Sequence, residues 1–277
     1  MELNVAVLLW GGTALFAKLI KLPAFQITCL RSVPAVLCLV GVLCFFRQGY
    51  ALRTGRDYIL SVLSGLALVA HWVTYFKSIQ LSTVAIGILS LHVYPVLTAL
   101  AEPLFFKEPF HPIDLLMTVV VLVGLGIMVP EVSLSSQTTQ GILWGILSAV
   151  FWTARNLLSR QLVQTYSGLK VMAYQLGVCA LVPLPWVVWG GQTVSPQAWG
   201  QLALLGVIFT ALPHTLFTNS LQHLTIRTVS VMATLLPIYG AVLAAMVLNE
   251  IPAARTLIGG AIVIAVVFYE TWRTVRR

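Results

Sequence analysis

A histidine and a carboxylate lie within an otherwise apolar stretch, SLHVYPVLTALAEPLFFKEPF, at residues 90–110. His92, Pro95, Ala99 and Glu102 are spaced so that they fall on one face of a helix. Pro95 removes a backbone hydrogen bond and can bend the helix toward that face. This spacing predicts a kinked helix that lines a pore, with Glu102 as the candidate proton-coupling group. The alternative is structural, with Glu102 bonded to a neighbouring helix and His92 to a backbone carbonyl.

Other polar side chains interrupt apolar segments in the same way. His71 and Trp72, in AHWVTYF, and His214, in PHTLFTN, are predicted to face the same cavity. Arg155 and Asn156, in FWTARNLLSRQ, could bind a substrate carboxylate, although the long side chain of Arg155 could also reach the membrane surface. Ionisable groups at mid-membrane depth normally face the interior of a helix bundle or a wet cavity.

Three charged residues are interpreted as structural. Arg31 stands early in its apolar segment, and Glu108 and Glu250 stand at turns between segments. Pro109 and Pro252 follow the two glutamates and can begin the next helices. We therefore expect capping or packing roles for these residues.

No catalytic or metal-binding pattern occurs in the sequence. It contains no GxSxG, HExxH or P-loop motif, and its four cysteines lie in apolar runs without CxxC spacing. An intramembrane aspartyl-type site needs two acids, and Glu102 has no partner at mid-segment. The sequence predicts no enzyme, no cofactor and no metal.

The composition indicates a membrane protein. Of the 277 residues, 59% are hydrophobic and only 9% are charged, and the mean hydropathy is +0.95. A soluble domain typically has about 25% charged residues. The net charge of +8 lies mainly between apolar runs, so it favours a role in membrane topology over nucleic-acid binding.

Ten apolar segments predict an all-α membrane protein with ten transmembrane helices, the first of them a retained span and no signal peptide. The segments are Leu3–Ile20, Ala24–Phe46, Tyr58–Phe76, Thr83–Phe106, Pro112–Val129, Gly141–Leu162, Leu169–Trp189, Ala198–Leu221, Thr228–Leu248 and Ala254–Trp272.

The positive charges predict the orientation. With a cytoplasmic N-terminus, most Lys and Arg residues of the loops and tail fall inside. The outer side receives only Lys18, Lys21, Lys77 and Arg255. We therefore expect both termini in the cytoplasm and a location in the inner (plasma) membrane.

The chain also repeats itself at an offset of 142 residues. This offset aligns Ser78 with Ser220, Gln80 with Gln222, Thr83 with Thr225, Pro95 with Pro237, Ala99 with Ala241, and Glu108 with Glu250. In addition, LLWGG of the first segment echoes ILWGI of the sixth. The repeat predicts two five-helix halves, residues 1–134 and 135–277, which enter the membrane from opposite sides. Inverted repeats of this kind are typical of secondary transporters.

The sequence resembles the EamA-type family of drug/metabolite transporters. The resemblance rests on the ten segments, the duplicated halves and the ending NEIPAARTLIGGAIVIAVV, with KEPFHPIDLLMTVVVLVGLGIMV as its first-half counterpart. CLRSVPAVL, which contains Arg31, is also typical of the family. The resemblance implies an inner-membrane exporter of small metabolites, often amino acids. It also implies that segments 1, 3, 4, 6, 8 and 9 line the cavity and that 5 and 10 pack outside them.

The sequence leaves the substrate and the energy source open. A passive channel or facilitator would use the same fold, and a translocator of lipid-linked carriers is a further alternative. The expected partners are a small-molecule substrate, membrane lipid and protons, with no nucleic acid. The expected assembly is a monomer or homodimer.

Overall fold

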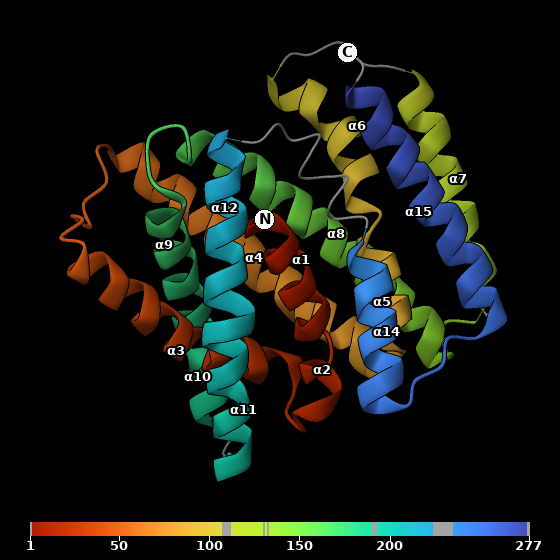
Figure 1. Cartoon of the computed structure of the whole chain (residues 1–277), viewed down its shortest axis with the longest axis horizontal. Coiled ribbons are helices and arrows are strands. Elements are labelled where there is room, and N and C mark those ends of the chain that lie inside the picture. The colour runs from red at the N-terminus through yellow and green to blue at the C-terminus, as the bar shows by residue number, and fades with distance from the viewer. Residues whose placement is uncertain are drawn as a thin grey trace.

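The structure is a computed structural model that describes residues 2–106, 112–129, 131, 133–189, 193–223 and 235–275. These residues form helices joined by turns and short connections, with no strand among them (Figure 1). The helices are α1 (Glu2–Thr13), α2 (Phe16–Leu19), α3 (Ala24–Phe45), α4 (Gly55–Leu81), α5 (Val84–Leu91), α6 (Tyr94–Phe106), α7 (Pro112–Met128), α8 (Gln137–Leu162), α9 (Gly168–Leu181), α10 (Leu184–Trp189), α11 (Pro196–Gly206), η1 (Val207–Ala211), α12 (Leu212–His223), α14 (Leu236–Leu248) and α15 (Ala254–Val275).

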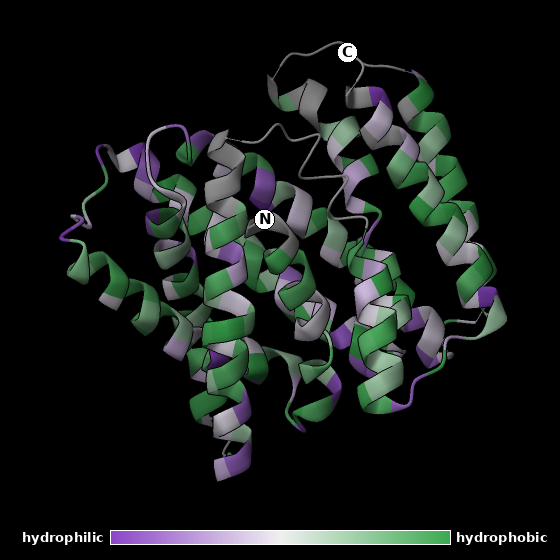
Figure 2. Cartoon of the chain, in the orientation of Figure 1, coloured by the Kyte–Doolittle hydropathy of each residue, from purple (hydrophilic) through white to green (hydrophobic). Residues whose placement is uncertain are grey.

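The helices carry apolar residues along their length, while hydrophilic residues gather at helix ends and turns (Figure 2). Among the described residues, six segments are long and apolar enough to cross a membrane: Ala24–Phe45, Gly55–Leu81, Val84–Ala101, Gln137–Leu162, Gly168–Trp189 and Pro196–Phe217. Four apolar helices are shorter: Val5–Leu19, Leu115–Met128, Leu236–Leu248 and Ala254–Tyr269. The predicted all-α membrane protein is confirmed, and the number of ten complete crossings stays a prediction.

Several predicted segments are broken helices, and proline explains the breaks. The segment predicted as Thr83–Phe106 divides into α5 and α6 between Leu91 and Tyr94. A proline ring clashes with the carbonyl four residues earlier, which for Pro95 is that of Leu91, the last residue of α5. In the same way a π-helical turn, η1, precedes α12, which carries Pro213 near its start. The bundle is therefore irregular at the depth of its candidate site.

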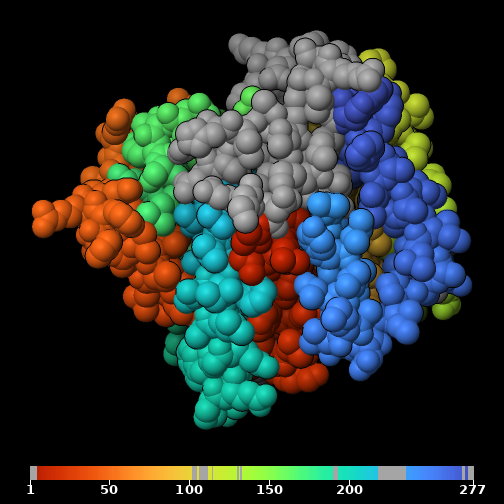
Figure 3. All heavy atoms as spheres, viewed as in Figure 1, coloured from red at the N-terminus to blue at the C-terminus, as the bar shows by residue number. Residues whose placement is uncertain are grey.

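The bundle is arranged around the crossing of α4 and α8. Helix α1 lies between α12 on one side and α14 on the other, and all three are seen together on the face in Figure 3. Helices α7 and α15 pack against each other at the edge of the molecule (Figure 1). At Gly259 of α15 a Cβ atom would collide with the backbone carbonyl oxygen of Gly124 in α7, so glycine permits this close approach.

Candidate functional site

A cavity of about 50 Å³ lies where helices from both ends of the chain meet. That volume holds a few water molecules. Its lining is mainly aromatic and contains three histidines, and it comprises Trp10, Thr13, His71, Trp72, Tyr75, Leu91, His92, Tyr94, Trp152, His214, Phe217 and Leu236. An apolar pocket with a few convergent polar groups is the usual form of a small-molecule site.

His71 is held in one orientation by α8. The Ser148 hydroxyl donates to the backbone carbonyl of His71 at 3.0 Å, and it lies 2.8 Å from His71 Nδ1. Since that hydroxyl already donates its proton, we assign Nδ1–H of His71 as the donor to Ser148 Oγ. The ring stacks parallel to Tyr75 at 5.8 Å and lies 4.6 Å from the Trp152 ring. The other nitrogen, Nε2, is then an acceptor in the neutral ring.

The other two histidines use carbonyls that lie four residues earlier. His92 Nδ1 lies 2.8 Å from the carbonyl oxygen of Ile88, at the break between α5 and α6. His214 Nδ1 lies 3.0 Å from the carbonyl oxygen of Thr210 and also 3.0 Å from Trp10 Nε1. An indole N–H only donates and a carbonyl only accepts, so Nδ1 can satisfy one of these partners at a time. The tautomer of His214 therefore decides whether α1 and α12 are joined by this hydrogen bond.

Aromatic rings form most of the cavity wall. The Trp10 and Trp152 rings meet edge to face at 6.1 Å, one from each half of the chain. Trp10 also contacts Phe217 at 4.8 Å, and Trp72 contacts His214 at 5.4 Å. Such contacts stabilise by about 0.5–1.5 kcal/mol per pair beyond the area that they bury. The wall therefore offers flat aromatic surface against which the apolar part of a solute can pack.

Arg31 lies directly behind the Trp72 wall and is fully buried. Its guanidinium carbon is 3.9 Å from the centre of the Trp72 ring and 4.7 Å from that of Phe76. Nη1 donates to Thr210 Oγ1 at 3.3 Å, whereas Nε and Nη2 have no hydrogen-bond partner in the described part of the chain. The positive charge thus faces neutral groups.

Arg155 lies behind Trp152 in a comparable position, and 1% of it is exposed. Its surroundings differ from those of Arg31, because its donors are satisfied. Nε and Nη2 donate to Gln175 Oε1 at 3.0 and 2.8 Å, and Nη1 donates to Asn156 Oδ1 at 3.0 Å. Two indoles of the cavity wall are therefore each backed by a buried guanidinium whose contacts are with neutral groups.

The structure brings four of the predicted site residues to one cavity: His71, Trp72, His92 and His214. Pro95 is the second residue of α6, next to the lining residue Tyr94, and is not itself in the lining. Arg155 and Asn156 are bonded to each other behind the wall. Glu102 belongs to α6, but its side chain lies outside the described residues, so its role stays a prediction.

Four aromatic residues of the cavity lining were not predicted as site residues: Trp10, Tyr94, Trp152 and Phe217. A signal for two of them exists, because Trp10 and Trp152 are separated by the same 142 residues as the other repeat landmarks. The echo between LLWGG and ILWGI instead pairs Trp10 with Trp144, which is 37% exposed and does not line the cavity. Of the two tryptophans in α8, the repeat offset selects the one at the site.

Glu250 and Glu108 were both interpreted as capping or packing residues. Glu250 Oε2 accepts a hydrogen bond at 2.9 Å from the backbone N–H of Val84, the first residue of α5. Glu250 therefore caps the N-terminus of α5, a helix that is distant from it in the sequence. Glu108 lies outside the described residues.

An apolar helix bundle with a central cavity, lined by residues from both halves of the chain, is the architecture typical of membrane transport proteins. The comparison of the sequence with family models gives the particular family. Two segments, residues 3–129 and 139–270, match the EamA-like transporter family. The chain belongs to this family.

Several relatives cover most of the chain. The uncharacterized transporter YxxF of Bacillus subtilis is 26% identical, over 88% of this chain and 79% of its own length. The pseudopaline exporter CntI of Pseudomonas aeruginosa is 28% identical, over 88% and 84%. A probable terminal-alkyne amino-acid exporter of Streptantibioticus cattleyicolor is 26% identical, over 68% and 64%. A solved crystal structure matches 99% of this chain with a TM-score of 0.71 and 18% identity, which shows the shared fold.

Proposed function

We propose that this protein is a secondary transporter that exports small metabolites, with amino acids as the expected class, across the inner membrane by alternating access. The observation that carries the proposal is the cavity, to which Trp10 and His71 contribute from one half and Trp152 and His214 from the other. A site shared between two halves changes its access when the halves rock against each other. The printed names of two relatives, an exporter of pseudopaline and a probable exporter of an amino acid, support export.

The proposed topology is two inverted repeats, residues 1–134 and 135–277, each crossing the membrane five times, with both termini in the cytoplasm. Two separate family matches, one within each proposed repeat, support the division. The orientation can be measured with a membrane-impermeant maleimide, which labels cysteines on only one side of a sealed vesicle.

The proposed substrate carries a carboxylate. Arg31 and Arg155 stand behind Trp72 and Trp152, so their charges make the potential inside the cavity positive. The hydroxyl groups of Tyr75 and Tyr94, both lining residues, make no hydrogen bond within the described residues and can donate to an anionic oxygen. The same charges repel a cationic amine, so the cavity favours amino acids over the matching amines.

Overproduction of the protein should raise the tolerance of cells to some toxic amino-acid analogues about fivefold or more and should lower their internal concentration, because an exporter removes them as they enter. The measurement is growth and efflux across a broad panel that includes each amino acid with its decarboxylated amine. Unchanged tolerance and efflux across the whole panel would contradict export. Better export of the amines than of the amino acids would contradict the carboxylate class alone.

Proton coupling through Glu102 is the further part of the proposal, and it rests on the sequence. Glu102 lies in α6 together with Pro95, and its repeat counterpart is Ala244, so the acid is present once. A carboxylate that faces alternately two compartments can carry a proton between them.

In vesicles, the Glu102→Gln variant should therefore exchange labelled solute at the wild-type rate. A proton gradient should accelerate its transport about tenfold less than it accelerates wild-type transport. Acceleration that persists in the folded variant would leave Glu102 with a structural role. Wild-type protein that only equilibrates its solute, whatever the gradient, would instead indicate a passive facilitator.

A further inference from the structure

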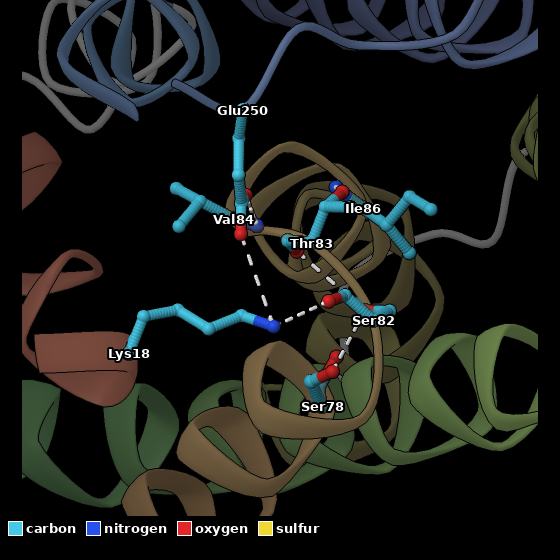
Figure 4. A network of polar contacts seen from close by, with 7 residues as sticks. All are labelled: Lys18, Ser78, Ser82, Thr83, Val84, Ile86 and Glu250. Carbon is cyan, nitrogen blue, oxygen red and sulfur yellow. Dashed lines mark hydrogen bonds and ion pairs between the residues drawn. The ribbon is translucent and has the colours of Figure 1, made fainter. Parts of the chain in front are cut away.

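A network of polar contacts joins three separate parts of the chain (Figure 4). Lys18, in α2, donates from Nζ to the backbone carbonyl of Ser82 at 2.6 Å, and its Nζ lies 3.8 Å from Glu250 Oε1. The other carboxylate oxygen of Glu250 accepts from the Val84 backbone N–H at 2.9 Å. We call Lys18, Ser82, Val84 and Glu250 the polar latch.

Each part of the polar latch continues into an element that lines the cavity. Lys18 follows α1, which contributes Trp10 and Thr13 to the lining. Val84 begins α5, and Leu91, at the other end of that helix, is in the lining about 10 Å away along the axis. Glu250 follows α14, which begins with the lining residue Leu236. The polar latch thus holds together the ends of three wall-forming elements.

Between the cavity and the polar latch, the same three elements are packed closely. A Cβ atom at Gly11 of α1 would lie 3.0 Å from the Tyr239 Cβ atom of α14. A Cβ atom at Gly240 of α14 would collide with the Ile88 side chain of α5. Helix α14 is therefore in close contact with both α1 and α5 at this end, and opening the end requires α1 and α5 to move away from α14.

The chemistry of the polar latch suits a contact that breaks and re-forms. Its side chains are partly exposed, 26% for Lys18 and 23% for Glu250, so water can replace the hydrogen bonds when the helices separate. The contact also joins elements from both proposed repeats, α2 and α5 from the first and the end of α14 from the second. Contacts within one repeat would not resist a movement of one repeat against the other.

We propose that the polar latch is a gate, which keeps this end of the cavity closed and must open once in each transport cycle. This inference rests on the proposed alternating access. It assigns Glu250 a role beyond capping, because the carboxylate holds a helix of the opposite repeat. Loss of the Lys18 or Glu250 charge should shift the equilibrium toward a state in which the cavity is open at this end.

The test measures access to the cavity and needs no substrate. Cys29, Cys38, Cys44 and Cys179 are first replaced by alanine or serine, and the lining residue Leu91 is replaced by cysteine. The rate at which a membrane-impermeant maleimide labels this cysteine is then measured in right-side-out and in inside-out vesicles. Glu250→Gln and Lys18→Met should each raise the rate about tenfold, from one side only.

Three matched variants separate the gate from a general loosening of the fold. Lys18→Arg keeps the charge and should label at the parent rate. Lys21→Met removes a nearby cation of the same connection that has no contact with the polar latch, and it too should label at the parent rate. Glu108→Gln, at the repeat-equivalent position, should not raise labelling from the side that responds to Glu250→Gln.

Parent-like labelling of both Glu250→Gln and Lys18→Met, or an equal rise for Lys21→Met, would overturn the gate. If Glu250→Gln fails to fold, Lys18→Met decides the matter, because it leaves the Glu250 cap on Val84 in place. Since labelling is independent of solute, a failure of the proposed export activity is distinguished from a failure of the gate.

Discussion

Trp152→Ala should lower the transport rate roughly 100-fold, which corresponds to about 2.7 kcal/mol. Trp152 lies at the centre of the cavity wall, where its ring contacts Trp10 at 6.1 Å, His71 at 4.6 Å and His214 at 6.2 Å. Its removal would take away the surface on which a solute packs and the neighbour that fixes the His71 ring. A buried aromatic residue with several aromatic partners is the kind of residue that dominates binding energy.

Trp144→Ala is the matched control, because Trp144 is an indole of the same helix that does not line the cavity. It should transport at nearly the wild-type rate. Trp152→Phe keeps an aromatic ring and should retain most of the activity, which separates loss of the wall from loss of folding. The measurement is the initial rate in vesicles, with the solute that the efflux panel identifies, alongside size-exclusion profiles. An equal loss of transport rate in Trp144→Ala would show that substitution disturbs helix α8 in general and that Trp152 has no particular role in the site.

The sequence predicted the helices well because the membrane leaves few alternatives. Long apolar runs have to satisfy their backbone groups internally, so their helical state follows directly from composition. The breaks were less predictable. Pro95 indicated a bend, and the structure places the break before it, at His92, because the proline ring acts on the preceding turn.

The residues of the candidate site that could be predicted are those whose side chains are energetically unfavourable in lipid. Histidines at 71, 92 and 214 must avoid hydrocarbon, and that requirement places them at the cavity in the structure. Tryptophan carries no such signal, because an indole is equally acceptable facing lipid, the interface or a cavity. Composition therefore cannot distinguish Trp152 from Trp144. The repeat offset can, because it pairs residues that occupy equivalent places in the two halves.

The surroundings of Arg31 could not be predicted from its position in the sequence. Its place early in the second segment favoured a structural role, but the structure buries it completely and leaves two of its nitrogens without hydrogen bonds among the described residues. A buried donor without a partner costs about 1–3 kcal/mol. The cation–π contacts of Arg31 with Trp72 and Phe76 offset part of this cost, so the stability of variants tests whether its role is structural.

Arg31→Met and Arg155→Met should therefore differ in their effects on stability. Methionine at 31 removes a buried charge and its unpaired donors, so the melting temperature should stay within about 3 °C of wild type or rise. Methionine at 155 deprives Gln175 Oε1 and Asn156 Oδ1 of their donors, which should destabilise by about 2–4 kcal/mol and lower the melting temperature by roughly 5–10 °C.

In transport, by contrast, we expect a defect in the Arg31→Met variant, which is the more stable of the two. The Arg31→Met variant should transport a carboxylate-bearing solute about tenfold more slowly than wild type, because the positive charge behind Trp72 is gone. Its transport of an uncharged solute should change little. The measurements are thermal unfolding in detergent and initial rates in vesicles for an amino acid and an uncharged analogue of similar shape. Equal losses of melting temperature in the two variants, or wild-type transport of the carboxylate by Arg31→Met, would return Arg31 to a structural role and leave the cavity without its proposed selectivity for anions.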